Sequence, residues 1–218
     1  MASSVRLWLL ACACFGIGCG GAAATAGASA RSTSGLPPPD DLKEGDYEVA
    51  AVQYRSACDS GVAEGCGFLA FMHDNGRGVP TDIALAVELA ERACNEGSAY
   101  GCAYLGYLYR VGRGVGQDAG RATALYRRSC DGDDMEGCVL LGMMYRAGEG
   151  VAMDPGQAAE LFKRACDGGE ASGCFSVGYM FAMGDGVARD LDAGLRYLHA
   201  ACEGGDQGGC DLVDQLEQ

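Results

Sequence analysis

The chain has 218 residues, of which 49% are hydrophobic, and its 30 acidic and 16 basic side chains give a formal net charge of −14. This apolar share is ample for a hydrophobic core, which excludes a wholly disordered chain. Because this negative charge repels phosphate backbones and anionic lipid headgroups, we expect neither nucleic-acid binding nor electrostatic membrane binding. Thirteen cysteines beside only two histidines argue against His-rich zinc sites and indicate disulfides in an oxidising compartment.

The N-terminal segment is typical of an exported protein. Residues Val5–Gly18 are apolar apart from Arg6. This run is too short for a stable transmembrane helix but suits a secretory signal peptide, which we predict over residues 1–18. Gly16-Ile17-Gly18-Cys19 resembles the lipobox of bacterial lipoproteins, so Cys19 is a candidate lipidation site. Cleavage after Ala28-Ser29-Ala30 is the alternative and gives a soluble secreted or periplasmic protein.

Residues 19–40 are predicted to form a flexible tether. They are rich in alanine, serine and glycine, and they end in three consecutive prolines, Pro37 to Pro39, which form a stiff stub. Nothing in this segment indicates a function.

Ten cysteines beyond the tether form two series that each advance by 36 residues without a slip. A repeat of this length is typical of a solenoid, in which stacked units bury apolar faces that no unit can bury alone. The first series holds Cys58, Cys94, Cys130, Cys166 and Cys202, and the second holds Cys66, Cys102, Cys138, Cys174 and Cys210.

Within each unit the residues predict a helix, a glycine turn and a second helix. Leu105 and Gly106 precede Tyr109 on one helical face, where the small residue lets another helix approach closely. Gly112-Arg113-Gly114-Val115 then ends the first helix, because glycine tolerates the left-handed conformation found at helix ends. An aspartate begins the second helix as its N-cap. Such aspartates recur at Asp46, Asp82, Asp118, Asp154 and Asp190.

We therefore predict an all-α fold, an αα-hairpin repeat solenoid over residues 41–218. Four full repeats are expected at about 62–97, 98–133, 134–169 and 170–205. A partial unit at 46–61 precedes them, and a partial unit at 206–218 with a polar helix, Gln207–Gln218, closes the array.

The spacing also predicts how the cysteines pair. Each pair joins the end of one second helix to the first turn of the next first helix, so a local disulfide closes a ring of about nine residues and contributes roughly 2–3 kcal/mol. The alternative, reduced core cysteines, does not explain the fixed spacing after an export signal. The predicted bridges are Cys58–Cys66, Cys94–Cys102, Cys130–Cys138, Cys166–Cys174 and Cys202–Cys210.

The run Ala99–Tyr109, followed by Gly112-Arg113-Gly114-Val115 and Asp118, closely resembles the Sel-1-like repeat, a relative of the tetratricopeptide repeat. With a cysteine pair in every unit, the chain resembles the disulfide-rich branch typified by the Helicobacter cysteine-rich proteins. The resemblance covers about residues 46–218. It implies a tetratricopeptide-like superhelix of a family whose members mostly act as adaptors for proteins or peptides. Several cysteine-rich members also carry a β-lactamase or penicillin-binding label.

The residues themselves do not indicate β-lactam chemistry. Serine β-lactamases need a serine three residues before a lysine, whereas an acidic residue stands there before each of the two lysines, Lys43 and Lys163. Zinc enzymes need several histidines, but His73 takes the place of a helix-packing aromatic and His199 a surface position. The acidic stretch at residues 131–136 is expected to be a solvated turn. We name no catalytic residue and expect no cofactor and no metal site.

The resemblance also gives positions for a binding groove. In tetratricopeptide-like stacks the first helices line the concave face, and this register points a stripe of aromatic and methionine side chains inward. We expect an extended peptide to lay apolar side chains on the stripe and a carboxylate on Arg110 or Arg146. The alternative is that part of the stripe packs helix to helix while both arginines are merely solvated. The expected groove residues are Phe71, Tyr100, Tyr107, Arg110, Met143, Arg146 and Tyr179.

We therefore expect an exported scaffold or adaptor that binds a protein or peptide of the cell envelope in its groove. Its expected location is the periplasm or the outer membrane, as a lipoprotein, or alternatively the secreted fraction. Membrane contact is expected only through a lipid anchor. The alternatives are a β-lactamase or penicillin-binding protein, a hydrolase by resemblance only, and a spacer tied to the cell wall. The sequence indicates neither the identity of the partner nor the oligomeric state.

Overall fold

The structure is a computed structural model that describes residues 35–218. The predicted signal peptide, the candidate lipidation site Cys19 and most of the predicted tether lie outside the described residues. Within residues 35–218 every regular element is helical. The elements are η1 (Pro39–Asp41), α1 (Tyr47–Asp59), α2 (Ala63–Asn75), α3 (Ile83–Asn95), α4 (Ala99–Val111), α5 (Ala119–Asp131), α6 (Met135–Ala147), α7 (Pro155–Asp167), α8 (Ala171–Met183), α9 (Leu191–Glu203) and α10 (Gln207–Leu216).

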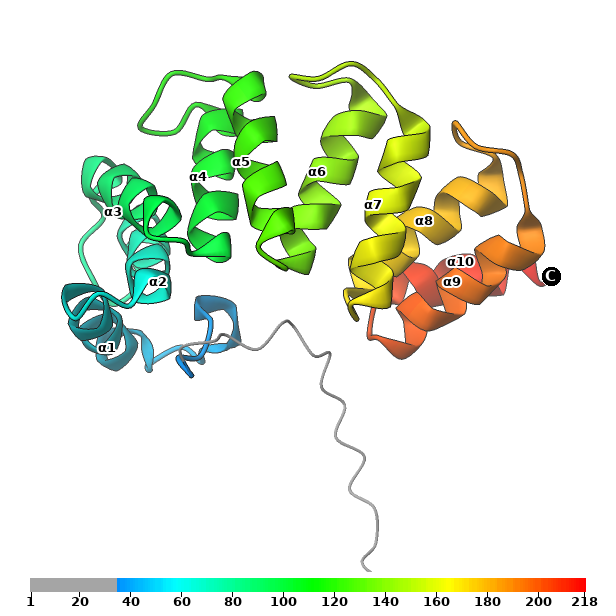
Figure 1. The fold of residues 1–218 in the computed structure, drawn as a ribbon. Helices are drawn as coiled ribbons and strands as arrows, with labels where there is room; N and C mark the ends of the chain where they lie inside the picture. The colour runs from blue at the N-terminus through cyan, green and yellow to red at the C-terminus, as the bar shows by residue number, and fades with distance from the viewer. Residues whose placement is uncertain (1–34) are drawn as a thin grey trace, which may run out of the picture.

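The helices follow one another along an arc (Figure 1). Each helix packs against its neighbours in the chain, and the even-numbered helices also contact one another from repeat to repeat, as α2 does α4 and α4 does α6. These additional contacts place the even-numbered helices in a continuous row on the inner side of the arc. The predicted all-α repeat solenoid is therefore confirmed.

Capping side chains and glycines set the ends of the helices. Asp82, Asp118, Asp154 and Asp190 each accept a hydrogen bond from a backbone N–H in the first turn of the helix that follows. At the other end of the hairpin, the glycine that follows each full first helix is left-handed, for example Gly112 with φ of 73°. The repeated aspartates thus fix where α3, α5, α7 and α9 begin, and the left-handed glycines fix where α2, α4, α6 and α8 end.

Small residues let the two helices of a hairpin pack closely. A Cβ atom on Gly106 would lie 2.8 Å from the ring of Tyr126, and one on Gly142 would lie 2.6 Å from the ring of Phe162. Both rings are fully buried. In these two repeats the glycine that follows the large apolar residue therefore makes room for an aromatic side chain of the next helix, and Gly178 makes room in the same way for Leu198.

Five disulfides join neighbouring helices in residues 35–218. Each links the end of an odd-numbered helix to the first turn of the next even-numbered helix, with Cα atoms 4.4 to 4.7 Å apart. The local pairing predicted from the spacing of eight residues is therefore present in the structure. The bridges are Cys58–Cys66, Cys94–Cys102, Cys130–Cys138, Cys166–Cys174 and Cys202–Cys210.

Arginines near the ends of the odd-numbered helices tie each repeat to the one before it. Arg92, Arg128 and Arg164 each donate a hydrogen bond of 2.9 Å from Nη2 to a backbone carbonyl of the preceding odd-numbered helix. Each acceptor is the carbonyl of a disulfide-bonded cysteine: Cys58, Cys94 and Cys130. Each of these carbonyls also accepts a backbone hydrogen bond from the turn that follows its helix, so the arginine adds a second, charge-assisted bond.

The last residues of the predicted tether pack against the solenoid. Pro39 is buried, and the Tyr54 hydroxyl donates a hydrogen bond of 2.6 Å to the carbonyl of Pro37. Leu36 and Leu42 contact the core beside α1 and α2. The packed chain thus begins before the predicted boundary at residue 40, because this segment offers apolar side chains and rigid prolines to the apolar surface of the first helices.

Candidate functional site

A cavity of about 240 Å³ lies on the inner face of the arc, between α2, α4, α6 and the N-terminal segment. Aromatic and acidic side chains make up most of its wall. The lining residues are Asp40, Phe71, Asp74, Asn75, Tyr100, Ala103, Tyr104, Tyr107, Glu136 and Leu140. Three of the seven predicted groove residues, Phe71, Tyr100 and Tyr107, therefore meet at one site.

The aromatic rings of the cavity support one another. Tyr104 stands at the centre, with its ring centroid 5.8 Å from that of Phe71, 6.2 Å from that of Tyr100 and 6.0 Å from that of Tyr107. The Phe71 contact is edge-to-face, and the other two are stacked. Such contacts add to the stability that burial gives, so the aromatic wall is held in place before any ligand arrives.

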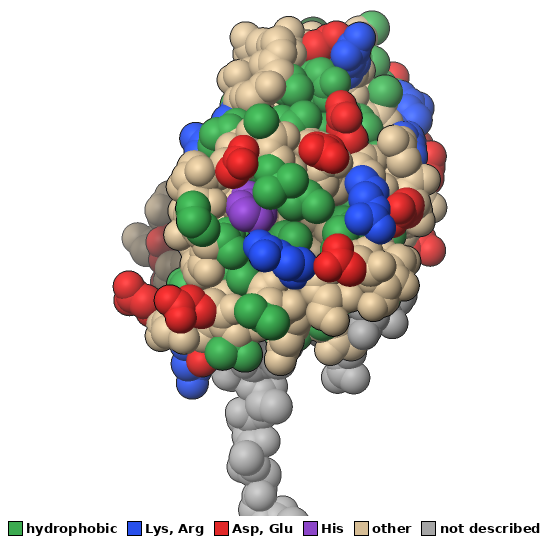
Figure 2. Space-filling view, turned by 90° about the vertical axis from the view of Figure 1, so that its left-hand side faces the viewer, with side chains coloured by type: hydrophobic (Ala, Val, Ile, Leu, Met, Phe, Trp, Pro, Cys, Tyr) green, Lys and Arg blue, Asp and Glu red, His purple; other side chains and the backbone are tan. Residues whose placement is uncertain are grey.

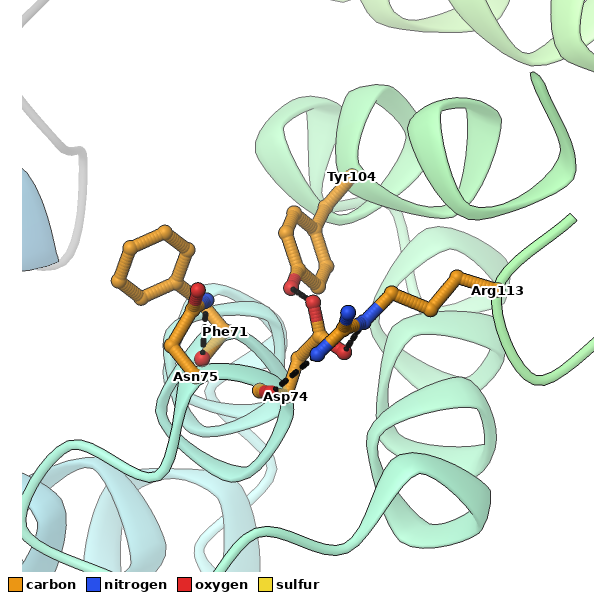
Figure 3. A network of polar contacts seen from close by, with 5 residues as sticks. All are labelled: Phe71, Asp74, Asn75, Tyr104 and Arg113. Atoms are coloured by element: carbon orange, nitrogen blue, oxygen red, sulfur yellow. Dashed lines mark hydrogen bonds and ion pairs between the residues drawn. The ribbon is translucent and has the colours of Figure 1, made fainter. Parts of the chain in front are cut away.

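A buried carboxylate fixes the central tyrosine (Figure 3). Asp74 is only 3% exposed, and it accepts a hydrogen bond of 2.7 Å from the Tyr104 hydroxyl. Arg113, in the turn after α4, forms an ion pair with this carboxylate and donates a second bond of 2.9 Å to the Asp74 carbonyl. Burial, together with the bond to Asp74, raises the pKa of Tyr104. The Asp74 charge is thus compensated by Arg113.

A second group of carboxylates in the cavity wall has fewer neighbouring cations to compensate its negative charge. Partial burial and the negative charges of Asp134, Glu170 and Asp40 raise the pKa of Glu136 from 4.5 to about 7. Glu136 forms no ion pair with the residues that the structure describes. Asp40, which also lines the cavity, is 4.0 Å from Arg77, at the limit of an ion pair, and its side chain is 72% exposed. This end of the cavity is therefore negative.

The remaining predicted groove residues lie apart from the cavity. Met143 is 45% exposed on α6 and Tyr179 is 36% exposed on α8, further along the inner row. Arg146 forms an ion pair with Asp185 at 3.8 Å. The Nε atom of Arg110 is buried and makes no hydrogen bond to the described part of the chain. The role of these residues in binding stays a prediction.

Seven of the ten residues that line the cavity were not among the expected groove residues: Asp40, Asp74, Asn75, Ala103, Tyr104, Glu136 and Leu140. Tyr104 follows Tyr100 by four residues and precedes Tyr107 by three, so helical spacing alone puts the three rings on one face. Glu136 is the equivalent of Tyr100 one repeat later. Asp74 occupies the inward-facing column of the repeat register that also holds Arg110 and Arg146, whereas Asp40 lies in the N-terminal segment, outside any repeat.

The histidines and the lysine that were weighed for β-lactam chemistry lie at positions that suggest no catalytic role. His73 is 6% exposed, with Nδ1 3.1 Å from the carbonyl oxygen of Pro80. His199 lies on the surface, with Nε2 3.1 Å from a carboxylate oxygen of Glu217. Lys163 pairs with an aspartate one turn further along α7. The β-lactamase alternative stays a hypothesis.

The acidic turn at residues 131–136 is tied into the repeat array. Asp133 accepts a bond of 3.1 Å from Arg164, and the Ser129 hydroxyl donates one of 2.7 Å to Asp134. Among residues 35–218, no group of three or more histidines, cysteines, aspartates or glutamates is placed to hold a metal ion. In the same range, no helix is long and apolar enough to cross a membrane.

Comparisons with known proteins agree on the type of repeat. A family model described as the Sel1 repeat matches residues 63–98, 99–134, 136–170 and 171–206, within a few residues of the predicted repeats. A search of the curated proteins found no match.

Three solved structures are similar to this chain. A protective antigen of uropathogenic Escherichia coli strains is 27% identical, with a TM-score of 0.67 over 78% of this chain and 37% of the antigen. A Sel1 repeat protein from Oxalobacter formigenes is 22% identical, with a TM-score of 0.71 over 78% of this chain and 68% of that protein. Helicobacter pylori cysteine-rich protein B is 28% identical, with a TM-score of 0.49 over 62% of this chain and 96% of that protein. The chain thus spans little more than a third of the E. coli antigen.

Proposed function

Because the chain belongs to the Sel1 repeat family, we propose that it is an exported scaffold that binds a protein or peptide along its inner face. Stacked helical repeats present extended concave surfaces, and such surfaces suit extended partners. The inner row of even-numbered helices supplies that surface here.

A stripe of exposed apolar side chains on α4, α6 and α8 carries this proposal. We call these residues the inner stripe: Tyr107, Val111, Met143, Tyr179 and Met183, which are 36% to 45% exposed. Tyr107, Met143 and Tyr179 are separated by 36 residues, so the repeat places one large apolar side chain on each inner helix. Exposed apolar side chains that recur across neighbouring elements are typical of a binding surface. No other element of the described chain covers them.

Five disulfides support the export part of the proposal. Disulfides form and persist in oxidising compartments and are rare in the cytosol. A chain with a bridge in every repeat therefore fits the periplasm or the cell exterior. The choice between a lipid-anchored and a freely secreted form depends on residues that precede the described part of the chain.

The binding proposal is tested by selecting peptides from a random library on the oxidised protein. We expect selected peptides to carry apolar side chains and to lose at least tenfold in affinity for the variant Tyr107→Ala/Met143→Ala/Tyr179→Ala. Truncating large anchors at the centre of an interface typically costs this much. Because each of the three side chains is partly exposed, the variant should stay folded, and its affinity is compared with that of the unmodified protein at matching helical circular dichroism.

A matched control comes from the opposite end of the fold. Val49 and Val52 on α1 are 62% and 70% exposed. Figure 2, which views the molecule from the side of α1 and α3, shows hydrophobic, acidic and basic side chains interspersed on this face. The variant Val49→Ala/Val52→Ala should bind the selected peptides as the unmodified protein does. Equal losses in both variants, or no loss in the first, would refute a site on the inner stripe.

A further inference from the structure

We propose that the cavity between α2, α4 and α6 binds a basic side chain, lysine or arginine, of the peptide that occupies the inner stripe. This inference rests on the proposed function and adds the charge of the ligand. It also reverses the expectation from sequence, in which a ligand carboxylate meets Arg110 or Arg146.

The carboxylates of the cavity supply the first part of the argument. Glu136 and Asp40 both lie close enough to Tyr100 for their charges to raise its pKa. Glu136 pairs with no cation of the described chain, and Asp40 has only the long contact to Arg77. Burial and the charges of Asp134, Glu170 and Asp40 raise the pKa of Glu136, and a cation placed between Glu136 and Asp40 would stabilise the charged form of both carboxylates.

The aromatic wall supplies the second part. Phe71, Tyr104 and Tyr107 present rings to the cavity, and cations bind favourably over such rings at distances up to about 6 Å. The protein already makes this contact beside the cavity, where the Arg77 guanidinium lies 5.1 Å from the centre of the Phe71 ring. Aromatic rings combined with carboxylates are a setting that favours cations over anions.

The arginines of the inner face argue against an anionic ligand. Arg113 forms an ion pair with Asp74, so the positive charge of Arg113 is already compensated. Arg146 pairs with Asp185. The Nε atom of Arg110 is buried, and its guanidinium lies near the Tyr126 hydroxyl on α5. None of these cations is among the residues that line the cavity.

Size and position favour one side chain of a longer ligand. Pockets for drug-sized molecules span about 300–1,000 Å³, and this cavity measures about 240 Å³. Tyr107 belongs both to the cavity wall and to the inner stripe, so the two surfaces are continuous. A peptide that lies along the stripe can therefore place one basic side chain in the cavity.

The test is a double-mutant cycle on the peptides selected above. The protein variant is Glu136→Gln, and the peptide variant replaces each lysine or arginine in turn with norleucine. We expect at least a tenfold loss of affinity for either change at one basic position, and little further loss when both are combined. Glu88→Gln, an exposed position on the outer helix α3, removes the same charge elsewhere and should leave affinity unchanged.

The pH dependence of binding gives a second readout. Burial and the charges of Asp134, Glu170 and Asp40 raise the pKa of Glu136 to about 7. Tyr100 and Tyr104 line the same cavity, and the cation Arg77 lies against Asp40. Affinity should therefore fall several-fold from pH 8 to pH 6 as Glu136 gains a proton, and this fall should vanish in Glu136→Gln. Because folding raises this pKa from 4.5 to about 7, the stability of the folded protein falls as the pH rises between these values, and the loss is complete above pH 7. Glu136→Gln should therefore melt no lower than the unmodified protein at pH 8.

Three outcomes would overturn the cation site. If the inner-stripe variant loses the peptides but Glu136→Gln and the norleucine peptides do not, the groove stands and the cation site is wrong. If the selected peptides are enriched in acidic residues, the charge assigned to the ligand is wrong. If Arg31→Ala increases peptide affinity at least tenfold, the chain's own N-terminal arginine, and not a partner, is the occupant. Failure to select any stripe-dependent peptide would instead refute the proposed function.

Discussion

At the scale of single residues, Asp74 shows how a charge is accommodated between two repeats. It is the one carboxylate that is almost fully buried in the described chain, and it joins α2 to α4 through the Tyr104 hydroxyl and to the next turn through Arg113. One repeat pair further on, the same two positions hold Arg146 and Asp185, with the signs exchanged. The second pair lies on the surface, where water screens it.

We expect Asp74→Asn to lower the free energy of unfolding by about 2 kcal/mol, because it removes charge-assisted hydrogen bonds in a buried setting. Asp185→Asn should cost less than about 0.5 kcal/mol, since exposed ion pairs contribute little. Urea unfolding of the oxidised proteins at pH 7.5 measures both. Similar losses in the two variants would contradict the distinction drawn between a buried and an exposed pair.

The residues of the cavity also show how far sequence reasoning reaches. Phe71, Tyr100 and Tyr107 were predicted because a repeat register assigns each position a face, and the structure places all three at the cavity. Tyr104 follows the same helical face but was not selected. Asp40 has no equivalent in any repeat, and its position depends on how the N-terminal segment packs, which local pattern does not determine.

At the scale of helices, the repeated aspartates act differently although they occupy equivalent positions. Asp154 has an extended backbone, with φ of −145° and ψ of 90°, and its carboxylate accepts a bond of 3.0 Å from the backbone N–H of Gln157. Asp46, before α1, has a helical backbone, with φ of −91° and ψ of −8°, and makes no such bond. N-capping needs the extended conformation, so the first helix lacks this cap.

This difference predicts unequal effects of the same substitution. Asp154→Ala should lower the free energy of unfolding by about 1 kcal/mol, the usual value of an N-cap bond, whereas Asp46→Ala should change it by less than about 0.5 kcal/mol. Chemical denaturation followed by circular dichroism measures both. If Asp46→Ala costs as much as Asp154→Ala, its carboxylate caps α1 in solution.

The repeated sequence pattern predicts the ends of the helices. The same pattern assigns Asp46 the role of the other aspartates, because it treats all equivalent positions alike. Each repeat presents aspartate and glycine at fixed distances, so the pattern predicts where helices begin and end. The pattern does not show what packs before a unit, and within residues 35–218 only η1 and its flanking segment, not a repeat, precede α1. The backbone before α1 therefore follows the packing of the N-terminal segment rather than the repeat.

At the scale of the whole molecule, stability is distributed along the array, because each repeat contacts mainly its neighbours. A disulfide recurs in every repeat. The arginine bonds to cysteine carbonyls join α3 to α1, α5 to α3 and α7 to α5, whereas α9 has Ala200 at the equivalent position. The hydrophobic core is smaller near the C-terminus, where the buried residues Ala182, Leu198 and Val213 form a separate cluster.

Removal of a disulfide should therefore have an effect that depends on its place. The paired change Cys130→Ala/Cys138→Ala lies in the middle of the array at two buried sulfurs, and it should lower the free energy of unfolding by about 2–3 kcal/mol. The paired change Cys202→Ala/Cys210→Ala lies at the end, where both cysteines are partly exposed. There the loss should be confined to fraying of α9 and α10.

Hydrogen exchange followed by mass spectrometry separates the two cases. The terminal change should speed exchange within residues 191–216 and leave α1 to α7 protected as before, because a frayed end transmits little strain through a chain of nearest-neighbour contacts. The central change should speed exchange in α5, α6 and the helices beside them, because neither half of the array can stabilise its neighbour across a loosened junction. If the terminal change deprotects the whole solenoid, the molecule unfolds as one cooperative unit and the bridges act on it together.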